Sequence, residues 1–484
     1  MCRSHRSAFL CLMTLSCILR CGVTRADDTP PPNILFILTD DQGWSSLSCY
    51  GNKHVPTPHL DRLAVQGMRF TDAYVMPQCT PTRAALLTGQ HTAQNRMWHV
   101  IGWYGYPWAR VTEPTFRENL PPEACRLTHE LRTAGYATGM GGKWHLTTNQ
   151  HGHYLYLKPS SAEAFGFDSV ASPGPGSQNE GDKWVDHLTD SACDFIEQNS
   201  ERPWFYYLSH HTLHGRVSAP KSLIDKHHAA GAPATGLQNA TYLAAIEHLD
   251  HSIGRLMKKL DELKLSDNTL VVFLSDNGGV DTQYVHPDLS ERLLRGESLL
   301  QTGKMEFDNA PLREGKGSVY EGGIRVPCIV RWPSEVKANS VCETPIHVVD
   351  WYPTLLSAAS ALPEEPTDGV DLMPLLRGES LASRDLYWHL PLYDLLWAST
   401  PAAVIRSGDW KLIEFFGDRF DRDGRYQIGR HSELYDLKHD IGESTNLAAA
   451  HPAKVAQLRK RLRVWIESMP AEIPAENPHF DPSK

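Results

Sequence analysis

The chain has 484 residues, a formal net charge of −10 and 41% hydrophobic residues, an ordinary globular composition with room for two or three domains. An acidic chain without a block of Lys and Arg is a poor nucleic-acid binder, and 13 Trp, 17 Tyr and 14 Phe exclude extended disorder. Beyond the first 26 residues, no stretch is apolar for long enough to cross a membrane.

The first 26 residues have the layout of a secretory signal peptide. A basic start is followed by an apolar core at 8–19 and by small residues that end at Ala26. The apolar core is short for a membrane anchor, and lipid attachment at Cys17 or Cys21 lacks a preceding run of small residues. The sequence therefore predicts an exported protein that is periplasmic or secreted, or of lysosomal type in a eukaryotic host.

Four of the ten cysteines lie in this leader, and the other six are scattered over the rest of the chain. Such spacing does not predict a disulfide-stapled scaffold. Cys328 and Cys342 could pair across a hairpin, and free buried thiols are the alternative.

Four short apolar runs each end abruptly in polar residues; they lie at 33–38, 136–140, 204–208 and 270–274. Unbroken apolarity is typical of strands buried on both faces, as in a parallel sheet covered by helices. The segments between them predict helices at 119–134, 186–199 and 237–263. This alternation indicates an α/β fold.

Polar side chains that can bind ligands or transfer protons follow all four runs. They are Asp40 and Asp41, Lys143 and His145, His210 and His211, and Asp276 and Asn277. In α/β sheets the ligand binds beyond the carboxyl ends of the strands. One such group would fit a helix cap or a loop, but four at the same end of a sheet indicate one site.

The last hundred residues have a different pattern. Segments at 403–406, 410–413 and 434–436 predict a small antiparallel sheet, followed by an amphipathic helix at about 454–469. We therefore divide the chain into a leader at 1–26, a catalytic domain at 33–380 and a C-terminal subdomain at 381–484.

The segment from Cys79 to Arg83, Cys-Thr-Pro-Thr-Arg, opens a predicted helix that ends at Gly89. Proline suits the first helical turn and glycine suits the exit. Cys79 is therefore expected at a helix N-terminus, where free N–H groups favour an anion. Arg83, one turn along, can bring a fixed positive charge to the same place.

This segment resembles the sulfatase signature Cys-x-Pro-x-Arg. Further blocks are similar to those of the family and stand in the same order: Asp40-Asp41, Gly142–His145, Asp276–Gly279, Gly315–Pro327, Trp410–Leu412 and Leu434–Asp436. The chain thus resembles a type I, formylglycine-dependent sulfatase. The resemblance implies an alkaline phosphatase-like fold, with a large, mostly parallel sheet between helices and a smaller C-terminal antiparallel sheet with a helix.

The resemblance also implies a nucleophile and a metal. A maturation enzyme would oxidise Cys79 to formylglycine, whose hydrate attacks sulfur and then expels sulfate by collapsing to the aldehyde; an unmodified helix-cap cysteine is the alternative. Oxygen ligands suit Ca²⁺, with Mg²⁺ as second choice. The predicted ligands are Asp40, Asp41, Asp276, Asn277 and residue 79. A helix-capping role for the first two is the alternative.

Charged and titratable residues complete the implied site. Arg83, Lys143 and Lys316 would form a positive wall around sulfate. The resemblance assigns His145 to the activation of the diol and His214, with a lysine, to protonation of the leaving oxygen. His211 stays open as the alternative to His214, because Arg216 stands where family members often carry proline.

Aromatic residues crowd the segment after the catalytic helix: Trp98, His99, Trp103, Tyr104, Tyr106 and Trp108. Their faces could stack on sugar rings, or they could form a packed cluster. We predict a sulfated carbohydrate as substrate, aryl sulfates as artificial substrates, and a role in specificity for the insert at 283–309. The alternative functions are a phosphoester or phosphonate hydrolase of the same superfamily and a catalytically inactive relative that binds sulfated glycans.

Overall fold

The structure is a computed structural model that describes residues 30–100, 109–148, 152–153, 155–174, 180–281, 305–397, 399–421 and 424–480. The predicted leader, four of the six crowded aromatic residues and most of the predicted insert lie outside these ranges. No helix in the described ranges is both long and apolar enough to cross a membrane.

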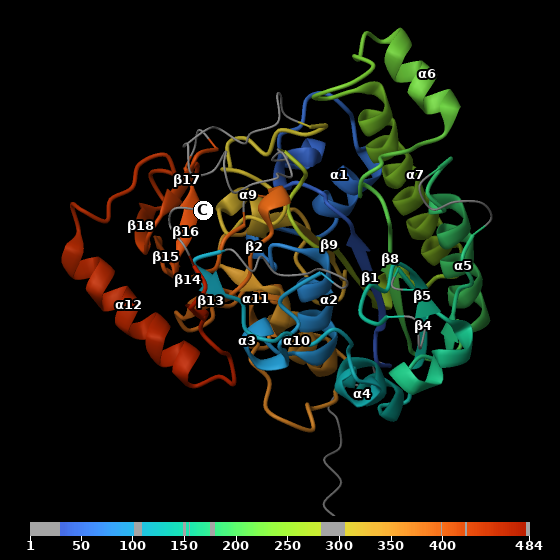
Figure 1. The fold of residues 1–484 in the computed structure, drawn as a ribbon. Helices are drawn as coiled ribbons and strands as arrows, with labels where there is room; N and C mark the ends of the chain where they lie inside the picture. The colour runs from blue at the N-terminus through green and yellow to red at the C-terminus, as the bar shows by residue number, and fades with distance from the viewer. Residues whose placement is uncertain are drawn as a thin grey trace, which may run out of the picture. The chain divides into compact units, whose positions relative to one another are not determined.

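A nine-stranded mixed sheet forms the centre of the fold (Figure 1). Its order is β11-β2-β10-β9-β1-β8-β4-β7, with β12 also paired to β2. The strands are β1 (Asn33–Thr39), β2 (Met68–Tyr74), β4 (Ala137–Gly142), β7 (Ser169–Val170), β8 (Trp204–Ser209), β9 (Thr269–Ser275), β10 (Arg325–Arg331), β11 (Ser340–Cys342) and β12 (Ile346–His347). The four predicted apolar runs are β1, β4, β8 and β9, which are parallel neighbours at the centre of the sheet.

Strands β2 and β10 were not predicted from the sequence. Strand β10 runs antiparallel to both β2 and β9, so the sheet is mixed rather than wholly parallel. Both strands carry charged residues, such as Arg69 in β2 and Arg325 and Arg331 at the two ends of β10, which break up the apolar pattern. The charge of Arg325 is accommodated inside the protein by Asp72, 2.8 Å away.

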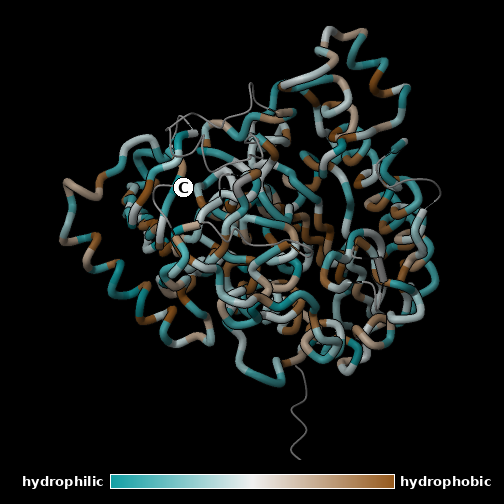
Figure 2. Tube along the Cα trace, in the orientation of Figure 1, coloured by the Kyte–Doolittle hydropathy of each residue, from teal (hydrophilic) through white to brown (hydrophobic). Residues whose placement is uncertain are grey.

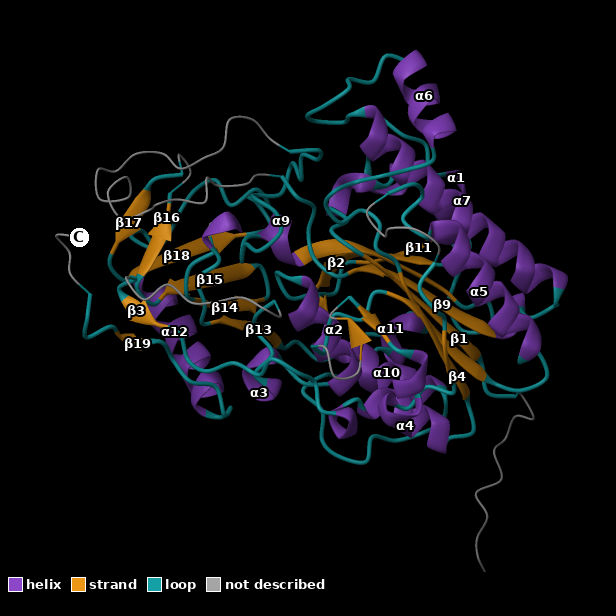
Figure 3. Cartoon of the chain, turned by 45° about the vertical axis from the view of Figure 1, so that its right-hand side comes forward, coloured by secondary structure: helices purple, strands orange, loops and turns teal. Residues whose placement is uncertain are grey.

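Helices cover both faces of the sheet (Figure 3). Alternate residues of β1 point to opposite faces, so Phe36 and Leu38 belong to one apolar core, and Leu35 and Ile37 to the other. The first core is closed by α2 (Cys79–Thr88), α4 (Arg126–Thr133), α10 (Trp351–Ala358) and α11 (Met373–Leu376). The second is closed by α1 (Pro58–Val65), α5 (Val185–Gln198) and α7 (Ala240–Glu262).

The predicted helices agree with the structure to different degrees. Those at 186–199 and 237–263 correspond to α5 and α7, whereas the one at 119–134 is shorter than expected. Pro121 and Pro122 confine its beginning to the 3-10 turn η3 (Pro122–Ala124), and α4 starts at Arg126. Other short helices are η1 (Trp44–Ser46), η2 (Ser48–Tyr50), α3 (Thr92–Asn95), η4 (Pro159–Ser161), η5 (Glu163–Phe165), α6 (Lys221–Ala229), η6 (Ser266–Asn268), α9 (Glu321–Ile324), η7 (Val348–Asp350) and η8 (Leu395–Trp397).

A separate four-stranded antiparallel sheet follows the large one, as expected. It consists of β13 (Asp385–Leu390), β14 (Ala402–Ser407), β15 (Trp410–Phe415) and β18 (His431–Asp436). Helix α12 (Pro452–Glu467) packs on it through Leu458, Leu462 and Ile466, and apolar and polar residues alternate along the helix in Figure 2. Small pairs elsewhere are β3 (Val111–Thr112) with β19 (Ala475–Glu476), β5 (Gly152–His153) with β6 (Tyr156–Leu157), and β16 (Asp418–Phe420) with β17 (Tyr426–Ile428).

A buried ion cluster ties this small sheet to the segment that carries Lys316. The ammonium of Lys411 in β15 lies 2.9 Å from Glu321 in α9 and 2.8 Å from Glu443, and all three side chains are inaccessible to solvent. Removing one member of such a cluster leaves a buried charge without its partner, which costs several kcal/mol. The Trp-Lys-Leu block therefore has a structural role at this junction.

The six cysteines beyond the leader are all free thiols. Cys328 and Cys342 are both buried and do not form a disulfide, so the free-thiol alternative is the correct one.

A buried histidine makes the stability of this fold sensitive to acid. His91 packs 4.8 Å from the ring of His347 and 5.4 Å from that of Trp465, and burial, aided by the charge of Arg384, lowers its pKa to about 3. The unfolded chain takes up a proton on His91 below about pH 6.5, while the folded chain does not, so stability falls as the pH drops through that value.

When the pH falls from 7 to 5, we therefore expect the free energy of unfolding of the wild type to drop by about 2 kcal/mol more than that of a His91→Leu variant. Urea unfolding at the two pH values measures the difference. The same substitution at the exposed His54 is the control. Equal acid sensitivity of the wild type and His91→Leu would contradict the assignment.

Candidate active site

Cys79 is the first residue of α2, as the sequence predicted. The hydroxyl of Thr82 accepts a hydrogen bond of 3.0 Å from the backbone N–H of Met76, which fixes the turn into the helix. Gly89 ends the helix with φ of 66°, and a side chain there would collide with the ring of Tyr352. All residues of α2 are buried, and burial raises the pKa of the Cys79 thiol.

Arg83 lies one turn beyond Cys79 and is completely buried. Its Nε and Nη2 donate to Oδ2 of Asp276 at 3.1 and 2.6 Å, and its Nη1 donates to the carbonyl of Lys143 at 3.0 Å and to Ser209 Oγ. The guanidinium thus connects the ends of β4, β8 and β9. Its contact with the predicted metal ligands is its ion pair with Asp276.

The four predicted oxygen ligands emerge side by side from β1 and β9. Thr39 and Ser275 are directly paired across these parallel strands, so the residues that follow them meet at the same edge. The backbone N–H of Asp41 donates to Asp276 Oδ1 at 3.2 Å, and Asn277 Nδ2 donates to Asp41 Oδ1 at 2.7 Å. Neither Asp40 nor Asp41 caps the following helix η1, whose N-cap is Gly43 without a side-chain bond.

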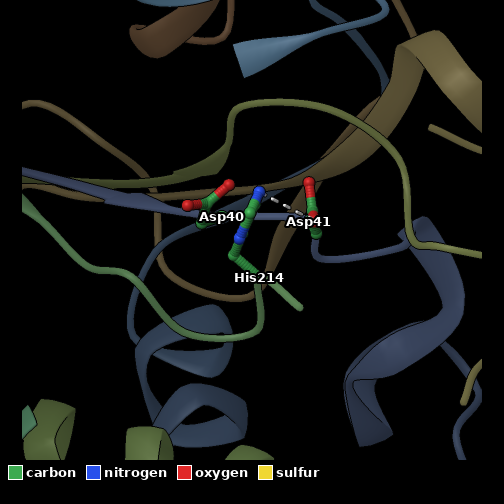
Figure 4. A group of neighbouring side chains, drawn as sticks. All are labelled: Asp40, Asp41 and His214. Carbon is green, nitrogen blue, oxygen red and sulfur yellow. Dashed lines mark ion pairs between the residues drawn. The ribbon is translucent and has the colours of Figure 1, made fainter. Parts of the chain in front are cut away.

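This arrangement fits a hard cation. The buried Oδ1 atoms of Asp40 and Asn277 accept no hydrogen bond from the described residues. Ligand atoms of Asp40, Cys79 and Asp276 lie within 4.8 Å of one another, as do those of Asp40, Asp41 and His214 (Figure 4). Carboxylate and amide oxygens are the donors that Ca²⁺ and Mg²⁺ prefer. Residues 40, 41, 276 and 277 could therefore hold such an ion, beside residue 79.

The carboxylates of Asp40 and Asp276, which lie beside Cys79, have opposite pKa shifts. Burial by itself would raise the pKa of Asp40, but the charges of Lys143, His214 and other cations hold it well below its usual range. Burial and the negative charge of Asp40 raise the pKa of Asp276 to about 7 despite Arg83. A divalent cation would relieve the repulsion between these carboxylates.

Two lysines approach the same edge. Lys143 Nζ lies 2.6 Å from Asp40 Oδ2, and Lys316 Nζ lies 2.8 Å from Asp41 Oδ1. Burial disfavours both ammonium groups, yet the neighbouring carboxylates raise the pKa of each above its ordinary value. With Arg83, these cations balance the three carboxylates in charge, so a bound divalent cation would make the site net positive and favour an anionic sulfate ester.

His145 lies against the predicted nucleophile. Its Nδ1 is 3.1 Å from Cys79 Sγ, and the hydroxyl of Thr80 donates to its carbonyl at 3.0 Å. Burial and the positive charges of Lys143 and Arg83 hold the pKa of His145 well below its usual range, so the imidazole is neutral at pH 7 and can accept a proton.

The structure distinguishes the three histidines after β8. His210 is completely buried, and His211 is 4% exposed with its ring edge-on to Trp184. The side chain of His214 is 37% exposed and points its Nε2 toward Asp41, 4.0 Å from Oδ2 (Figure 4). Desolvation by the surrounding residues and the positive charge of Lys316 lower the pKa of His214. Of His211 and His214, the latter is the one whose ring faces the acidic pair, and its role as proton donor stays a prediction.

Of the two alternatives for the crowded aromatic residues, the packed cluster is the correct one for Trp98 and His99, the two that can be placed. Trp98 and His99 are 0% and 1% exposed, because they pack beneath the small sheet and against Phe116. The other four lie outside the described residues.

Trp397, in the 3-10 turn η8 between β13 and β14, is an aromatic residue near the site that was not predicted from the sequence. The half-buried ring of Trp397 in η8 lies 5.4 Å from Lys316 Nζ. Gly317 permits this approach, since a Cβ there would lie 2.4 Å from Trp397 Cβ, and Ser399 Oγ donates to the Gly317 carbonyl. No local pattern marks Trp397, because its contact with Lys316 depends on how segments far apart in the sequence pack together.

The family models and known proteins that match this chain are those of sulfatases. The sulfatase family model matches residues 32–361, and the model for the C-terminal part of N-sulphoglucosamine sulphohydrolase matches residues 315–471. The chain is 30% identical to a sulfatase of Formosa agariphila, over 96% of this chain and 94% of the relative. It is 31% identical to human arylsulfatase A, over 92% and 89% of the two chains. It is 30% identical to an N-acetylgalactosamine-6-O-sulfatase of Bacteroides thetaiotaomicron, over 89% and 92%.

Solved structures with the same fold include sulfatases and phosphonate hydrolases. A Bacteroides thetaiotaomicron protein labelled 6S-sulf, from work on the metabolism of multiple glycosaminoglycans, superposes with a TM-score of 0.67 at 26% identity, covering 91% of this chain and all of the other. A phosphonate monoester hydrolase of Silicibacter pomeroyi gives a TM-score of 0.63 at 22% identity, covering 90% and 96% of the two chains. The latter likeness concerns the fold alone.

The fold and the site thus define a hydrolase of the alkaline phosphatase-like architecture. The family matches decide its class: this chain belongs to the sulfatase family, whose members are sulfuric ester hydrolases. The phosphoester and phosphonate alternative is not favoured, because the family model and the relatives that match most of the chain are sulfatases.

Proposed function

We propose that this protein removes sulfate from a sulfated carbohydrate with a formylglycine at position 79 and a calcium ion held by Asp40, Asp41, Asp276 and Asn277. The observation that carries the proposal is the convergence of Cys79, the two acidic strand ends and His145 around one point. A Cys at a helix start, with ligand atoms of Asp40 and Asp276 within 4.8 Å, fits the sulfatase chemistry better than a packing role.

The proposed reaction at residue 79 is a displacement at sulfur followed by an elimination of sulfate. One hydroxyl of the aldehyde hydrate attacks sulfur, the bond between sulfur and the sugar oxygen breaks, and the sugar alcohol leaves with a proton. The second hydroxyl then loses its proton, the carbon–oxygen bond to sulfate breaks, and the aldehyde forms again. Water restores the hydrate. Neutral His145, beside residue 79, is suited to accept the proton of this diol.

The cations and His214 have separate proposed roles. When bound, calcium would polarise the sulfate and the diol as a Lewis acid. Lys143 and Lys316 would orient the sulfate oxygens and stabilise their charge. His214 would protonate the leaving oxygen, because its Nε2 faces the site, and the negative charge of a bound sulfate ester raises the pKa of a nearby imidazole.

Two observations support a carbohydrate substrate. The relatives that match most of this chain include an N-acetylgalactosamine-6-O-sulfatase, and a similar solved protein comes from work on glycosaminoglycans. In addition, Trp397 offers an aromatic face next to Lys316, where a sugar ring attached to the sulfate could stack.

This role for Trp397 predicts a selective loss of binding. We expect Trp397→Ala to raise KM for the cleaved sulfated saccharide by about ten-fold with a smaller change in kcat, while Trp397→Phe keeps most of the affinity. Steady-state kinetics of both variants measures the effect. A loss of kcat at unchanged KM would instead mean that the ring only supports Lys316.

The proposed function is tested by a screen of defined sulfated saccharides with protein whose residue 79 and calcium content have been verified by mass spectrometry and metal analysis. We expect release of inorganic sulfate from at least one saccharide. Hydrolysis of phosphate or phosphonate esters in preference to all sulfate esters would support the alternative hydrolase. Binding of sulfated glycans without any sulfate release would support the inactive relative.

The remaining proposals concern maturation and destination. We propose that residues 1–26 are a cleaved leader, that a maturation enzyme oxidises Cys79, and that the product acts outside the cytoplasm as a catalytic domain at 33–380 with a subdomain at 381–484. N-terminal sequencing of the mature protein tests the first of these, and a mature chain that begins at Met1 would contradict it.

A further inference from the structure

The loop that carries His214 is attached to the rest of the site at its beginning. After β8, the carbonyl of Thr212 accepts a hydrogen bond of 2.9 Å from the backbone N–H of Asp40, and the carbonyl of Asp40 accepts one from Leu213. These bonds fix the first part of the loop to the end of β1. They do not reach the peptide groups that follow His214.

The later part of the loop is held by a buried lysine. Lys183 Nζ donates to the carbonyl of His214 at 2.7 Å and to that of Arg216 at 3.0 Å. Lys183 is 1% exposed, and no ion pair joins it to a carboxylate in the described part of the chain. An ammonium group buried in this way is costly unless its hydrogen bonds are made, so these two carbonyls are its main local support.

The segment around Lys183 is itself rigidly held. Lys183 and Trp184 both have left-handed φ values, of 54° and 63°, and both carboxylate oxygens of Asp182 accept backbone hydrogen bonds at the start of α5. Ser218 Oγ also donates to the Gly181 carbonyl at 2.6 Å. The start of α5 therefore makes several contacts with the histidine loop.

From these contacts we infer that Lys183 is a positioning residue that holds His214 in the orientation required to protonate the leaving oxygen. The Nδ1 of His214 donates to the Gly215 carbonyl at 2.8 Å, so the ring orientation depends on the peptide groups between the two carbonyls that Lys183 binds. Without Lys183, that part of the loop loses both of these bonds, and the Nε2 no longer has a fixed place above Asp41. Displacement of a catalytic group by about 1 Å can cost about a hundred-fold in rate.

The inference rests on the proposed role of His214. The experiment distinguishes a failure of the positioning role of Lys183 from a failure of the role of His214. Protonation matters for a poor leaving group, such as a sugar alcohol, and little for 4-nitrophenolate, which leaves as a stable anion. We expect Lys183→Met to lower kcat/KM about 30-fold for a sulfated saccharide and less than about three-fold for 4-nitrophenyl sulfate. Lys183→Arg, which keeps the donors, should retain more activity than Lys183→Met.

Two further variants complete the experiment. Lys221→Met removes an exposed lysine on α6, so we expect no change on either substrate. In a double-mutant cycle, the effects of Lys183→Met and His214→Ala on the saccharide should not add, because both remove the same proton donor. If Lys183→Met does not fold, the same comparison is made with Lys183→Gln.

The outcomes separate the two hypotheses. Equal losses on both substrates in the Lys183 variants, or additivity with His214→Ala, would overturn the positioning role. If His214→Ala itself slows both substrates equally, the proposed role of His214 fails as well.

Discussion

Replacing Cys79 by alanine is expected to lower kcat for sulfate ester hydrolysis by at least about 10⁴-fold, because it removes the proposed nucleophile that forms and releases the covalent sulfate ester. The helix should remain intact, since alanine is the best helix former. Release of sulfate from the best saccharide, followed by ion chromatography, measures the loss.

Cys79→Ser gives a sharper test of the diol. Serine has one hydroxyl, so it can attack sulfur but cannot expel sulfate by collapse to an aldehyde. We expect one sulfate to remain on the protein, with a mass increase of about 80 Da in the peptide that contains residue 79. Cys49→Ser, at a half-buried cysteine outside the site, is the control. A Cys79→Ser variant with full turnover, or an active wild type that retains the thiol, would refute the formylglycine assignment.

Removal of the metal is expected to have an effect of similar size. A chelator should lower kcat by at least about 10³-fold and reduce the thermal midpoint, and Ca²⁺ should restore both. The midpoint is a readout that does not depend on turnover. It should rise with added Ca²⁺ because the ion would stabilise three carboxylates that lie close together in the folded protein only.

Asp276→Asn is the better variant for this test, because its amide oxygen can still accept a hydrogen bond from the buried Arg83, whereas alanine would leave the guanidinium without an acceptor at this position and cost about 3–5 kcal/mol of stability. We expect Asp276→Asn to bind Ca²⁺ at least about ten-fold more weakly by calorimetry. The control is Asp186→Ala, which removes one member of the other acidic cluster, at Asp182, Asp186 and His248. Full activity after chelation, or equal calcium loss in both variants, would exclude the proposed ion site.

Much of this site could be predicted because its parts are local. Each predicted carboxylate or amide ligand follows a buried apolar run, and parallel strands in register bring Asp40 and Asp276 to the same edge without any further information. Cys79 and Arg83 lie one helical turn apart, so the helix alone fixes their relation. These are consequences of the short-range pattern and the strand direction, both of which can be deduced from the sequence.

Other parts depended on packing between distant segments. The burial of Trp98, the approach of Trp397 to Lys316 and the antiparallel course of β10 leave no periodic pattern in the chain. The burial of charged residues such as Lys411 was equally unpredictable, because its cost is offset only by partners far away in sequence.

The histidine loop illustrates the division most clearly. The sequence by itself determined that histidines follow β8 and that acidic pairs follow β1 and β9, because each of these depends on residues adjacent in the chain. Only the tertiary structure decided that His214 faces Asp41 while His211 packs against Trp184, and that Lys183 holds the loop. A loop without its own regular hydrogen bonds takes its conformation from the elements that surround it, and those are brought together only by folding.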